Sequence, residues 1–390
     1  MTVIKEYLRT ALRYALLRDT SGTDRLMEAS DDELKSLYRL ALSQDLGHIV
    51  AYTLTSLMKL PSGELGAAYS KQYGLAIYRT SMIETWLSKV SCALSEIGVK
   101  HIPLKGSVIR GYYPEPWMRT SCDIDILIKH EDLDRATKHL IASLGMRSEG
   151  RHVHDVSLYT EDNVHLELHF SLMEQGSASD SYSVLDNVWD HATASQGSEY
   201  VYSLDDAVFY LYHIAHAARH LEKSGSGIRA VIDLYYLDNL PNADVAARDA
   251  LLKETGLYTV ASCMRTIADA WLGEGEYTDL AKELEDYMLE NGIYGEFKNS
   301  VALMYNKKTG KHRKLRYILS RIFLPYRMMK YAYPILERMP ILLPFCHLHR
   351  WIGRILHGRL GHGLSEISII NSFDDEKLDA KDKLIKNLGL

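Results

Sequence analysis

Residues 101–107 read HIPLKGS, residues 123–128 read DIDILI and residues 164–169 read VHLELH. In the second segment one isoleucine separates Asp123 from Asp125 inside an apolar run, and this period of two is typical of a β-strand. Both carboxylates therefore project from one face of the strand, while Ile124 and Ile126 enter the core. Because two carboxylates at this spacing repel each other unless a cation lies between them, the segment predicts a metal site.

A third carboxylate comes from Glu167 in the last of these segments. Residues 153–160 and 164–170 alternate apolar and polar side chains, and the polar turn between them predicts a β-hairpin. Magnesium prefers carboxylate oxygens and completes its coordination shell with water and substrate phosphates. We therefore predict that Asp123, Asp125 and Glu167 are catalytic and bind two Mg²⁺ ions roughly 3.5–4 Å apart, for which Mn²⁺ is a substitute.

The phosphate is expected at the turn Lys105-Gly106-Ser107, which follows a short buried strand and opens a helix. Glycine lets a phosphate approach the backbone, Ser107 adds a hydrogen-bond donor, and a helix N-terminus favours anions. Lys105 is either a further phosphate contact or a solvated turn residue. Arg119, just before the acidic strand, is either a triphosphate contact or the internal partner that neutralises Asp123. The segment thus predicts phosphate at one end of the site and metal at the other.

These residues resemble the signature of the DNA polymerase beta-type nucleotidyltransferase superfamily, which combines an apolar-Gly-Ser turn, an Asp-x-Asp strand and a third acid on a later strand. A closer resemblance, to a group of bacterial nucleotidyltransferase family proteins, rests on Pro103-Leu104-Lys105-Gly106, Tyr113-Pro114, Arg119, Asp123-Ile124-Asp125 and Glu167-Leu168-His169. It is dense over residues 94–172 and thinner beyond. The resemblance implies a magnesium-dependent enzyme that transfers a nucleoside monophosphate from a nucleoside triphosphate such as ATP to an acceptor.

A second block of the same resemblance lies in the helices predicted over residues 205–235. His216, Gly227-Ile228-Arg229 and Asp233 match it, which implies a helical hairpin across the cleft from the metals. There His216 or Arg229 would meet phosphate, and Asp233 would steer or deprotonate the acceptor. Two other readings stay open. Arg229 and Asp233, one helical turn apart, would only fasten the helices, or a metal would bind on the helix face that carries His213, His216 and His220.

Helical patterns flank the predicted sheet on both sides. In residues 1–63 leucines recur at helical spacing and Ser30-Asp31-Asp32-Glu33 forms a capping box, while a long helix over residues 64–97 is expected to cover the sheet. We predict an α+β fold, with a small mixed-sheet nucleotidyltransferase core embedded between mostly helical N-terminal and C-terminal regions. The expected divisions are an N-terminal helical region (1–63), the core (64–195), a helical domain forming the far side of the cleft (196–306) and a basic amphipathic helical region (307–390).

Composition and charge indicate a soluble cytoplasmic protein. The 390 residues carry a net charge of −6, which argues against a dedicated nucleic-acid partner. Residues 1–15 lack the continuous apolar core of a signal peptide, and no apolar run reaches the roughly 20 residues that span a bilayer. The cysteines lack disulfide or metal spacing and are expected to be reduced thiols: Cys92, Cys122, Cys263 and Cys346.

Residues 307–359 differ in composition from the rest of the chain. They contain thirteen Lys and Arg residues and one acidic residue, Glu337, with aromatic residues between them. Such a segment packs its apolar side on the preceding helices, makes peripheral contact with an anionic membrane surface, or binds a nucleic acid. All three readings stay open.

The leading functional hypothesis is an enzyme that moves a nucleoside monophosphate to the hydroxyl group of a small molecule or a protein by metal-assisted in-line attack. The alternative is a catalytically weak, nucleotide-binding regulatory or assembly module anchored through residues 307–359. A third reading is a zinc hydrolase, because His165, Glu167 and His169 alternate on one strand face with two imidazoles and one carboxylate.

Overall fold

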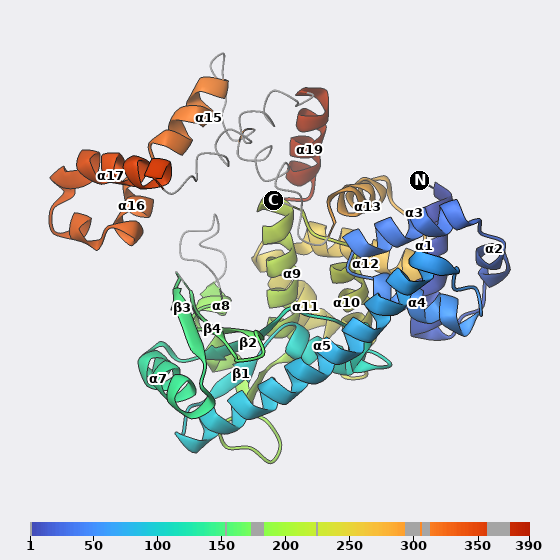
Figure 1. Cartoon of the computed structure of the whole chain (residues 1–390), viewed down its shortest axis with the longest axis horizontal. Coiled ribbons are helices and arrows are strands. Elements are labelled where there is room, and N and C mark those ends of the chain that lie inside the picture. The colour runs from blue at the N-terminus through green and yellow to red at the C-terminus, as the bar shows by residue number, and fades with distance from the viewer. Residues whose placement is uncertain are drawn as a thin grey trace.

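The computed structural model describes residues 2–152, 154–172, 183–223, 225–292, 305, 313–356 and 375–390. Most of these residues lie in helices, and a single five-stranded sheet lies beside the helical bundle (Figure 1). The predicted α+β class and mixed sheet are confirmed. The arrangement of a core embedded between flanking regions stays a prediction.

The sheet has the strand order β1-β2-β5-β4-β3. Its strands are β1 (His101–Pro103), β2 (Asp123–Ile128), β3 (Arg147–Arg151), β4 (Asp155–Tyr159) and β5 (His165–His169). β2 and β5 are parallel, whereas the other neighbouring strands pair antiparallel. Because β5 runs beside β2 in the same direction, paired residues of the two strands project from the same face of the sheet.

The two faces of β2 meet different surroundings, as the period of two predicts. Ile124 and Ile126 are fully buried in a cluster that includes Trp86 of α5 (Gly63–Glu96) and Leu140 of α7 (Leu133–Leu144). The aspartates between them project from the opposite face, toward α9 (Asp206–Lys223). One face of the sheet therefore packs against helices, and the other face carries the aspartates that line a cavity.

The other helices form a bundle whose buried side chains belong to one cluster. The cluster joins Leu8 and Leu12 near the N-terminus with Trp271 and Met288, and Lys5 is ion-paired with Glu285. Residues 1–63 and 196–291 thus share a hydrophobic core, although the divisions expected from the sequence stay predictions. The bundle comprises α1 (Thr2–Leu17), α2 (Thr23–Met27), α3 (Asp31–Ser43), α4 (Gly47–Ser56), α9, α10 (Arg229–Asp238), α11 (Val245–Glu254), α12 (Tyr258–Leu272) and α13 (Asp279–Asn291).

Short elements connect these parts. Ser30 caps α3 in the predicted capping box, accepting a hydrogen bond from the backbone of Glu33 and donating from its own backbone to the Glu33 carboxylate. A four-residue helix, α6 (Gly106–Ile109), follows β1. Before α9 lie α8 (Ser183–Asp186) and a small hairpin of β6 (Ala192–Ala194) and β7 (Tyr202–Leu204). Residues 173–182, which precede α8, lie outside the described residues.

The C-terminal part contains α15 (Arg313–Ile322), α16 (Tyr326–Ala332), α17 (Leu343–Leu356) and α19 (Asp375–Asn387). α19 packs on α13 and adds Leu384 and Leu388 to the core of the bundle. In Figure 1, α15, α16 and α17 stand apart from the sheet. Residues 307–312 and 357–359 of the predicted basic stretch lie outside the described residues. Among the described helices, none has the length and apolar character needed to cross a bilayer.

Candidate active site

The three predicted metal ligands come together on the open face of the sheet. β2 and β5 pair so that Asp125 lies opposite Glu167 and Asp123 lies opposite His165. Potential ligand atoms of Asp123, His165 and Glu167 lie within 4.8 Å of one another, and the same holds for Asp125, Glu167 and His169. Glu167 belongs to both groups, so this cluster could hold a metal ion, and carboxylate oxygens are ligands that Mg²⁺ prefers.

The predicted zinc site of His165, Glu167 and His169 is not formed among the described residues. It requires one ligand group that contains His165, Glu167 and His169, but the two histidines fall into different groups, each with an aspartate. His169 instead acts on the carboxylates. Its Nε2 atom lies 2.8 Å from Asp125 Oδ1 and 3.3 Å from Glu167 Oε2. This arrangement orients both acids.

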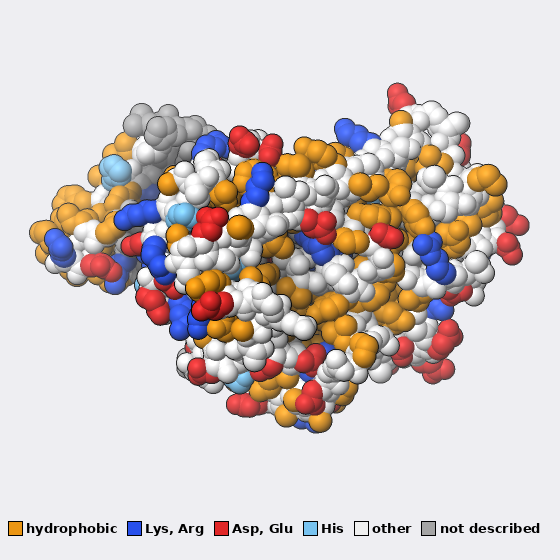
Figure 2. All heavy atoms as spheres, turned by 90° about the horizontal axis from the view of Figure 1, so that it is seen from below, with side chains coloured by type: hydrophobic (Ala, Val, Ile, Leu, Met, Phe, Trp, Pro, Cys, Tyr) orange, Lys and Arg blue, Asp and Glu red, His pale blue; other side chains and the backbone are white. Residues whose placement is uncertain are grey.

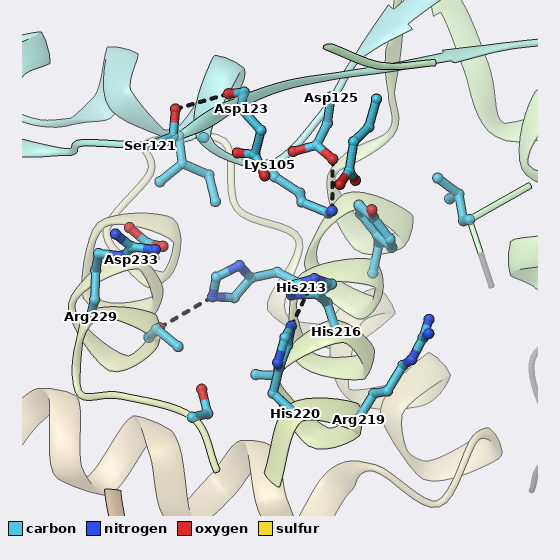
Figure 3. A pocket seen from close by; sticks show the side chains of 18 of the residues that line it. Lys105, Ser121, Asp123, Asp125, His213, His216, Arg219, His220, Arg229 and Asp233 are labelled. Atoms are coloured by element: carbon cyan, nitrogen blue, oxygen red, sulfur yellow. Dashed lines mark hydrogen bonds and ion pairs between the residues drawn. The ribbon is translucent and has the colours of Figure 1, made fainter. Parts of the chain in front are cut away.

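Asp125 is held by two basic neighbours, Lys105 and His169. Lys105 Nζ donates a hydrogen bond of 2.7 Å to the same Oδ1 atom that His169 contacts (Figure 3). Burial alone would raise the pKa of Asp125, but Lys105 and His169 outweigh it and lower the pKa. Burial alone would lower the pKa of His169, but its hydrogen bonds to Asp125 and Glu167 outweigh burial and raise the pKa. Asp125 is therefore ionised.

Asp123 differs from its neighbour. Burial and the adjacent Asp125 charge raise its pKa, and Lys105 offsets only part of this effect. Ionisation of Asp123 is thus less favourable than for an exposed aspartate, as the sequence predicts for paired carboxylates. A divalent cation would remove this penalty.

Lys105 is not a solvated turn residue, because its side chain points toward the predicted metal ligands. Its side chain is largely buried and paired with Asp125, and its backbone has a φ of 46° and a ψ of −122°. Residues other than glycine rarely adopt this backbone conformation, and backbone strain of this kind concentrates at functional sites. The strained turn delivers the ammonium group to the carboxylate cluster.

Gly106 is required by a close approach that the sequence did not reveal. A Cβ atom at this position would lie 3.1 Å from Ser121 Cβ. Ser121 in turn accepts a 2.6 Å hydrogen bond from Arg110 and donates one of 3.1 Å to the backbone oxygen of Asp123. The glycine therefore lets the turn pack directly against the loop that leads into the acidic strand.

We expect the substitution Gly106→Ala to lower the rate of the nucleotidyl transfer predicted from the sequence by about tenfold or more, because the methyl group would displace Ser121 and with it the start of β2. The measurement is the initial rate of pyrophosphate release at saturating nucleotide. Gly111→Ala is the matched control, since no atom lies within 4 Å of its added methyl group. A Gly106→Ala enzyme as active as the Gly111→Ala enzyme would contradict this role.

Ser107, the predicted hydrogen-bond donor, is not among the residues that line the cavity beside the carboxylates. Its Oγ atom is buried and has no hydrogen-bond partner among the described residues. Ser121 lines the cavity. The sequence does not distinguish these serines, because the direction in which the first turn of α6 projects its side chains is set by packing.

A cavity of about 380 Å³ separates the sheet from α9 and α10. It is lined by the nine other residues predicted for the site: Lys105, Gly106, Arg119, Asp123, Asp125, Glu167, His216, Arg229 and Asp233. Figure 3 shows His216, His220 and Arg219 on α9, across from Lys105 and the aspartates. The helical hairpin therefore forms the far wall of the cavity.

Sequence reasoning missed several residues of that wall. Tyr212, Arg219 and Lys223 line the cavity from the same helix as His216 and His220. The signal was available in their spacing, because positions 212, 216, 219 and 223 are three or four residues apart and share a helix face. Among the groups of described residues that could hold a metal ion, none contains these histidines, and His213 contacts the backbone oxygen of Ala230 at 3.1 Å.

Arg119 neutralises Asp233 rather than Asp123. The guanidinium makes two hydrogen bonds to the Asp233 carboxylate, of 2.6 Å and 2.8 Å, and the Tyr113 hydroxyl donates a third of 2.7 Å. Burial alone would raise the pKa of Asp233, but Arg119 outweighs it and lowers the pKa. A carboxylate that is 1% exposed and held in this way is a poor base, so Asp233 fits a positioning role.

The predicted pair of Arg229 and Asp233 is likewise wrong. Arg229 is ion-paired with Asp45, which follows α3 in the N-terminal part of the chain. Two separate ion pairs therefore tie α10 to other parts of the structure, one to the loop before β2 and one to the N-terminal helices. Together they hold the far wall against the sheet.

Buried histidines predict a pH dependence of stability. Burial lowers the pKa of six of them: His48, His101, His213, His216, His220 and His347. Below pH 6.5 the unfolded chain binds protons that these folded residues exclude, so the free energy of unfolding falls as the pH falls. His169, whose pKa is raised, has the opposite effect on the free energy of unfolding, but more histidines have a lowered pKa.

For His220 the pKa is lowered from 6.5 to about 4, which corresponds to ~2 kcal/mol of lost stability at pH 5. We expect urea midpoints measured between pH 7.5 and 5 to fall, and to fall less steeply for His220→Gln. An unchanged slope in that variant would contradict the assignment.

Comparison with known proteins agrees with this geometry. A family model described as an uncharacterised nucleotidyltransferase matches residues 30–273. No curated protein matches the chain. Among solved structures, the antibiotic-resistance factor ANT(2'')-Ia is similar at 12% identity and a TM-score of 0.27, covering 50% of this chain and 91% of that chain. That likeness is too weak to inform the choice of acceptor. The family match covers more than half of the chain and contains all the carboxylates of the site, so the chain belongs to this nucleotidyltransferase family.

Proposed function

We propose that this protein transfers a nucleoside monophosphate from a nucleoside triphosphate to a hydroxyl group, with Mg²⁺ bound at the carboxylates. The observation that carries the proposal is the convergence of Asp123, Asp125 and Glu167 from adjacent parallel strands onto one cavity. Neighbouring carboxylates are costly unless they serve a cation. The family match supports nucleotidyl transfer independently.

In the proposed reaction the acceptor oxygen forms a bond to the α-phosphorus, and pyrophosphate leaves with the electrons of the bond that breaks. Asp123, Asp125 and Glu167 would hold the metal, which when bound neutralises charge at the entering and leaving oxygens. Lys105 and His169 keep Asp125 ionised and oriented. Glu167, which is more exposed than Asp125, would accept the acceptor's proton.

The nucleotide occupies the cavity between sheet and helices in this proposal. Gly106 lies at its sheet side, while His216 and Arg229 line its far wall beside Arg219 and Lys223. This wall is rich in cationic side chains, which suits a triphosphate. Arg119 and Asp233 fix the distance between the walls through their ion pair.

The decisive experiment is incubation of the protein with labelled ATP, CTP, GTP or UTP, Mg²⁺ and cell extract, followed by identification of the labelled product. We expect label on a small molecule or a protein, release of pyrophosphate, and loss of both when the metal is chelated. The mildly acidic net charge of −6 favours such acceptors over nucleic acid. Nucleotide binding without pyrophosphate release across a broad acceptor panel would overturn the enzymatic proposal.

One observation favours the alternative of a catalytically weak regulatory or assembly module. Lys105 already supplies a positive charge to Asp125, at a position where a metal would bind. If Lys105 blocks the metal, Lys105→Ala will raise turnover.

We expect the opposite, a loss of about tenfold or more, because without the ammonium group Asp125 loses an orienting hydrogen bond. Magnesium titrations of pyrophosphate release by Lys105→Ala and by the unmodified protein distinguish the two functions.

We further propose that the reaction takes place in the cytoplasm. Cys92, Cys122, Cys263 and Cys346 all belong to the described residues, and none of them forms a disulfide. Cysteines without disulfides are typical of a reducing compartment.

A further inference from the structure

Residues 313–356, containing α15, α16 and α17, combine strong positive charge with exposed apolar side chains. They contain nine Lys and Arg residues and one acidic residue, Glu337, whereas the whole chain carries a net charge of −6. Their buried residues Met329, Leu336 and Cys346 form a small cluster of their own. The segment therefore has an interior that does not need its outer apolar residues.

The outer face of α17 carries an apolar stripe. Ile341, Phe345, Leu348 and Ile352 are 80%, 68%, 59% and 46% exposed. Phe345, Leu348 and Ile352 are spaced by three and four residues, so they lie along one side of α17, and Ile341 lies in the short 3-10 turn (Pro340–Leu342) just before the helix. Cys346, between them in sequence, is buried on the other side of the same helix. This stripe, residues 341, 345, 348 and 352, is called the α17 stripe below.

A second exposed series runs along α15. Leu315 and Leu319 of α15, and Phe323 directly after its last residue, recur at every fourth residue and are all exposed. Figure 2 shows hydrophobic side chains together with Lys and Arg at the end of the molecule that these helices form. Isolated apolar residues on a surface are ordinary, but aligned series on two neighbouring helices mark an interaction site.

The charge of the segment selects the partner. Two copies of a segment with nine basic residues and one acidic residue would repel each other. Nucleic acid would attract the charge but would leave aliphatic side chains such as Ile341 and Leu348 without a partner, because phosphates and sugars contact cationic and polar groups. An anionic lipid surface can bind both kinds of side chain, because the acyl chains contact the apolar stripe and the lipid phosphates contact the basic residues.

We propose that residues 313–356 dock on an anionic lipid surface, with the α17 stripe inserted at the boundary between headgroups and acyl chains. α17 has 14 residues, fewer than the roughly 20 that cross a bilayer, so it lies in the plane of the surface. This interaction does not depend on the proposed nucleotidyl transfer.

The test is co-sedimentation of the full chain with vesicles. With phosphatidylcholine vesicles that contain phosphatidylglycerol at about 30 mol%, we expect at least about tenfold more bound protein than with phosphatidylcholine alone, and release by about 0.5 M salt. Phe345→Ser combined with Leu348→Ser should weaken this binding by about 100-fold, because two apolar side chains lose their burial in lipid. Both positions are exposed, and a thermal melt checks that the fold is intact.

Met58→Ser combined with Val245→Ser is the matched control. Both residues are as exposed as the stripe but lie outside residues 313–356, so binding should be unchanged. The proposal is overturned if neither vesicle type binds, if uncharged vesicles bind equally well, or if the stripe variant binds as tightly as the unmodified chain. It is also overturned if the stripe variant abolishes self-association in light scattering, or if a labelled oligonucleotide binds more tightly than vesicles regardless of the stripe.

Discussion

Replacing Asp123 by asparagine is expected to lower the rate of nucleotidyl transfer by a factor on the order of 10³, while the folded state becomes as stable as before or more so. The rate falls because asparagine removes one of the charges that hold the metal. Stability is retained because the ionised Asp123 is opposed by burial and by Asp125, which raise its pKa. Its amide isostere carries no charge and escapes that penalty.

Two measurements on one preparation check this prediction: the initial rate of magnesium-dependent pyrophosphate release and the urea midpoint at pH 7. Asp134→Asn is the control, because Asp134 is an exposed acid on α7 and should change neither value. Asp125→Asn is a less clean variant, since it leaves the buried Lys105 ammonium without its carboxylate. Turnover of Asp123→Asn within tenfold of the unmodified enzyme would remove the carboxylate cluster from the mechanism.

Breaking the ion pair between Arg119 and Asp233 is expected to have the largest effect on stability. Asp233→Asn leaves the Arg119 guanidinium buried and without its counter-charge, which costs about 3–5 kcal/mol of unfolding free energy. Because the pKa of Asp233 is lowered, the pair stabilises the fold above pH 3.8 and the contribution is lost as the pH falls through the lower, folded value. Urea denaturation at pH 7 measures the cost.

A double variant separates the missing charge from lost packing. Arg119→Met combined with Asp233→Leu removes both charges, so it should be clearly more stable than Asp233→Asn alone. We expect low turnover in the double variant even so, because α10 loses its hold on the loop before β2. Equal stability of single and double variants would mean that the pair is only a packing feature.

The sequence predicted the parts of the site that depend on local periodicity. A period of two places Asp123 and Asp125 on one face, and the same rule applied to residues 164–170 selects Glu167, which the parallel register sets opposite Asp125. The capping box at Ser30 and the long helix α5 also follow from local signals. These rules need information only from neighbouring residues.

The pairing partners of the charged residues were not predictable in this way. Arg119 meets Asp233 and Arg229 meets Asp45, across separations of 114 and 184 residues, whereas sequence reasoning offered nearer partners for both arginines. Which carboxylate a buried arginine reaches depends on how the helices pack. The shared core of residues 1–63 and 196–291 was not predictable for the same reason. An amphipathic pattern shows which face of a helix is buried, but it does not show which other helix packs against that face.

The return of the chain at α19 has a consequence for how this architecture can vary. α19 packs on α13, although α15, α16 and α17 lie between them in sequence, and Leu384 and Leu388 join the interior of the bundle. Residues 313–356 are therefore preceded and followed in sequence by helices of the bundle. Because those two helices stay anchored, we expect that changes within residues 313–356 leave the packing around the carboxylates intact.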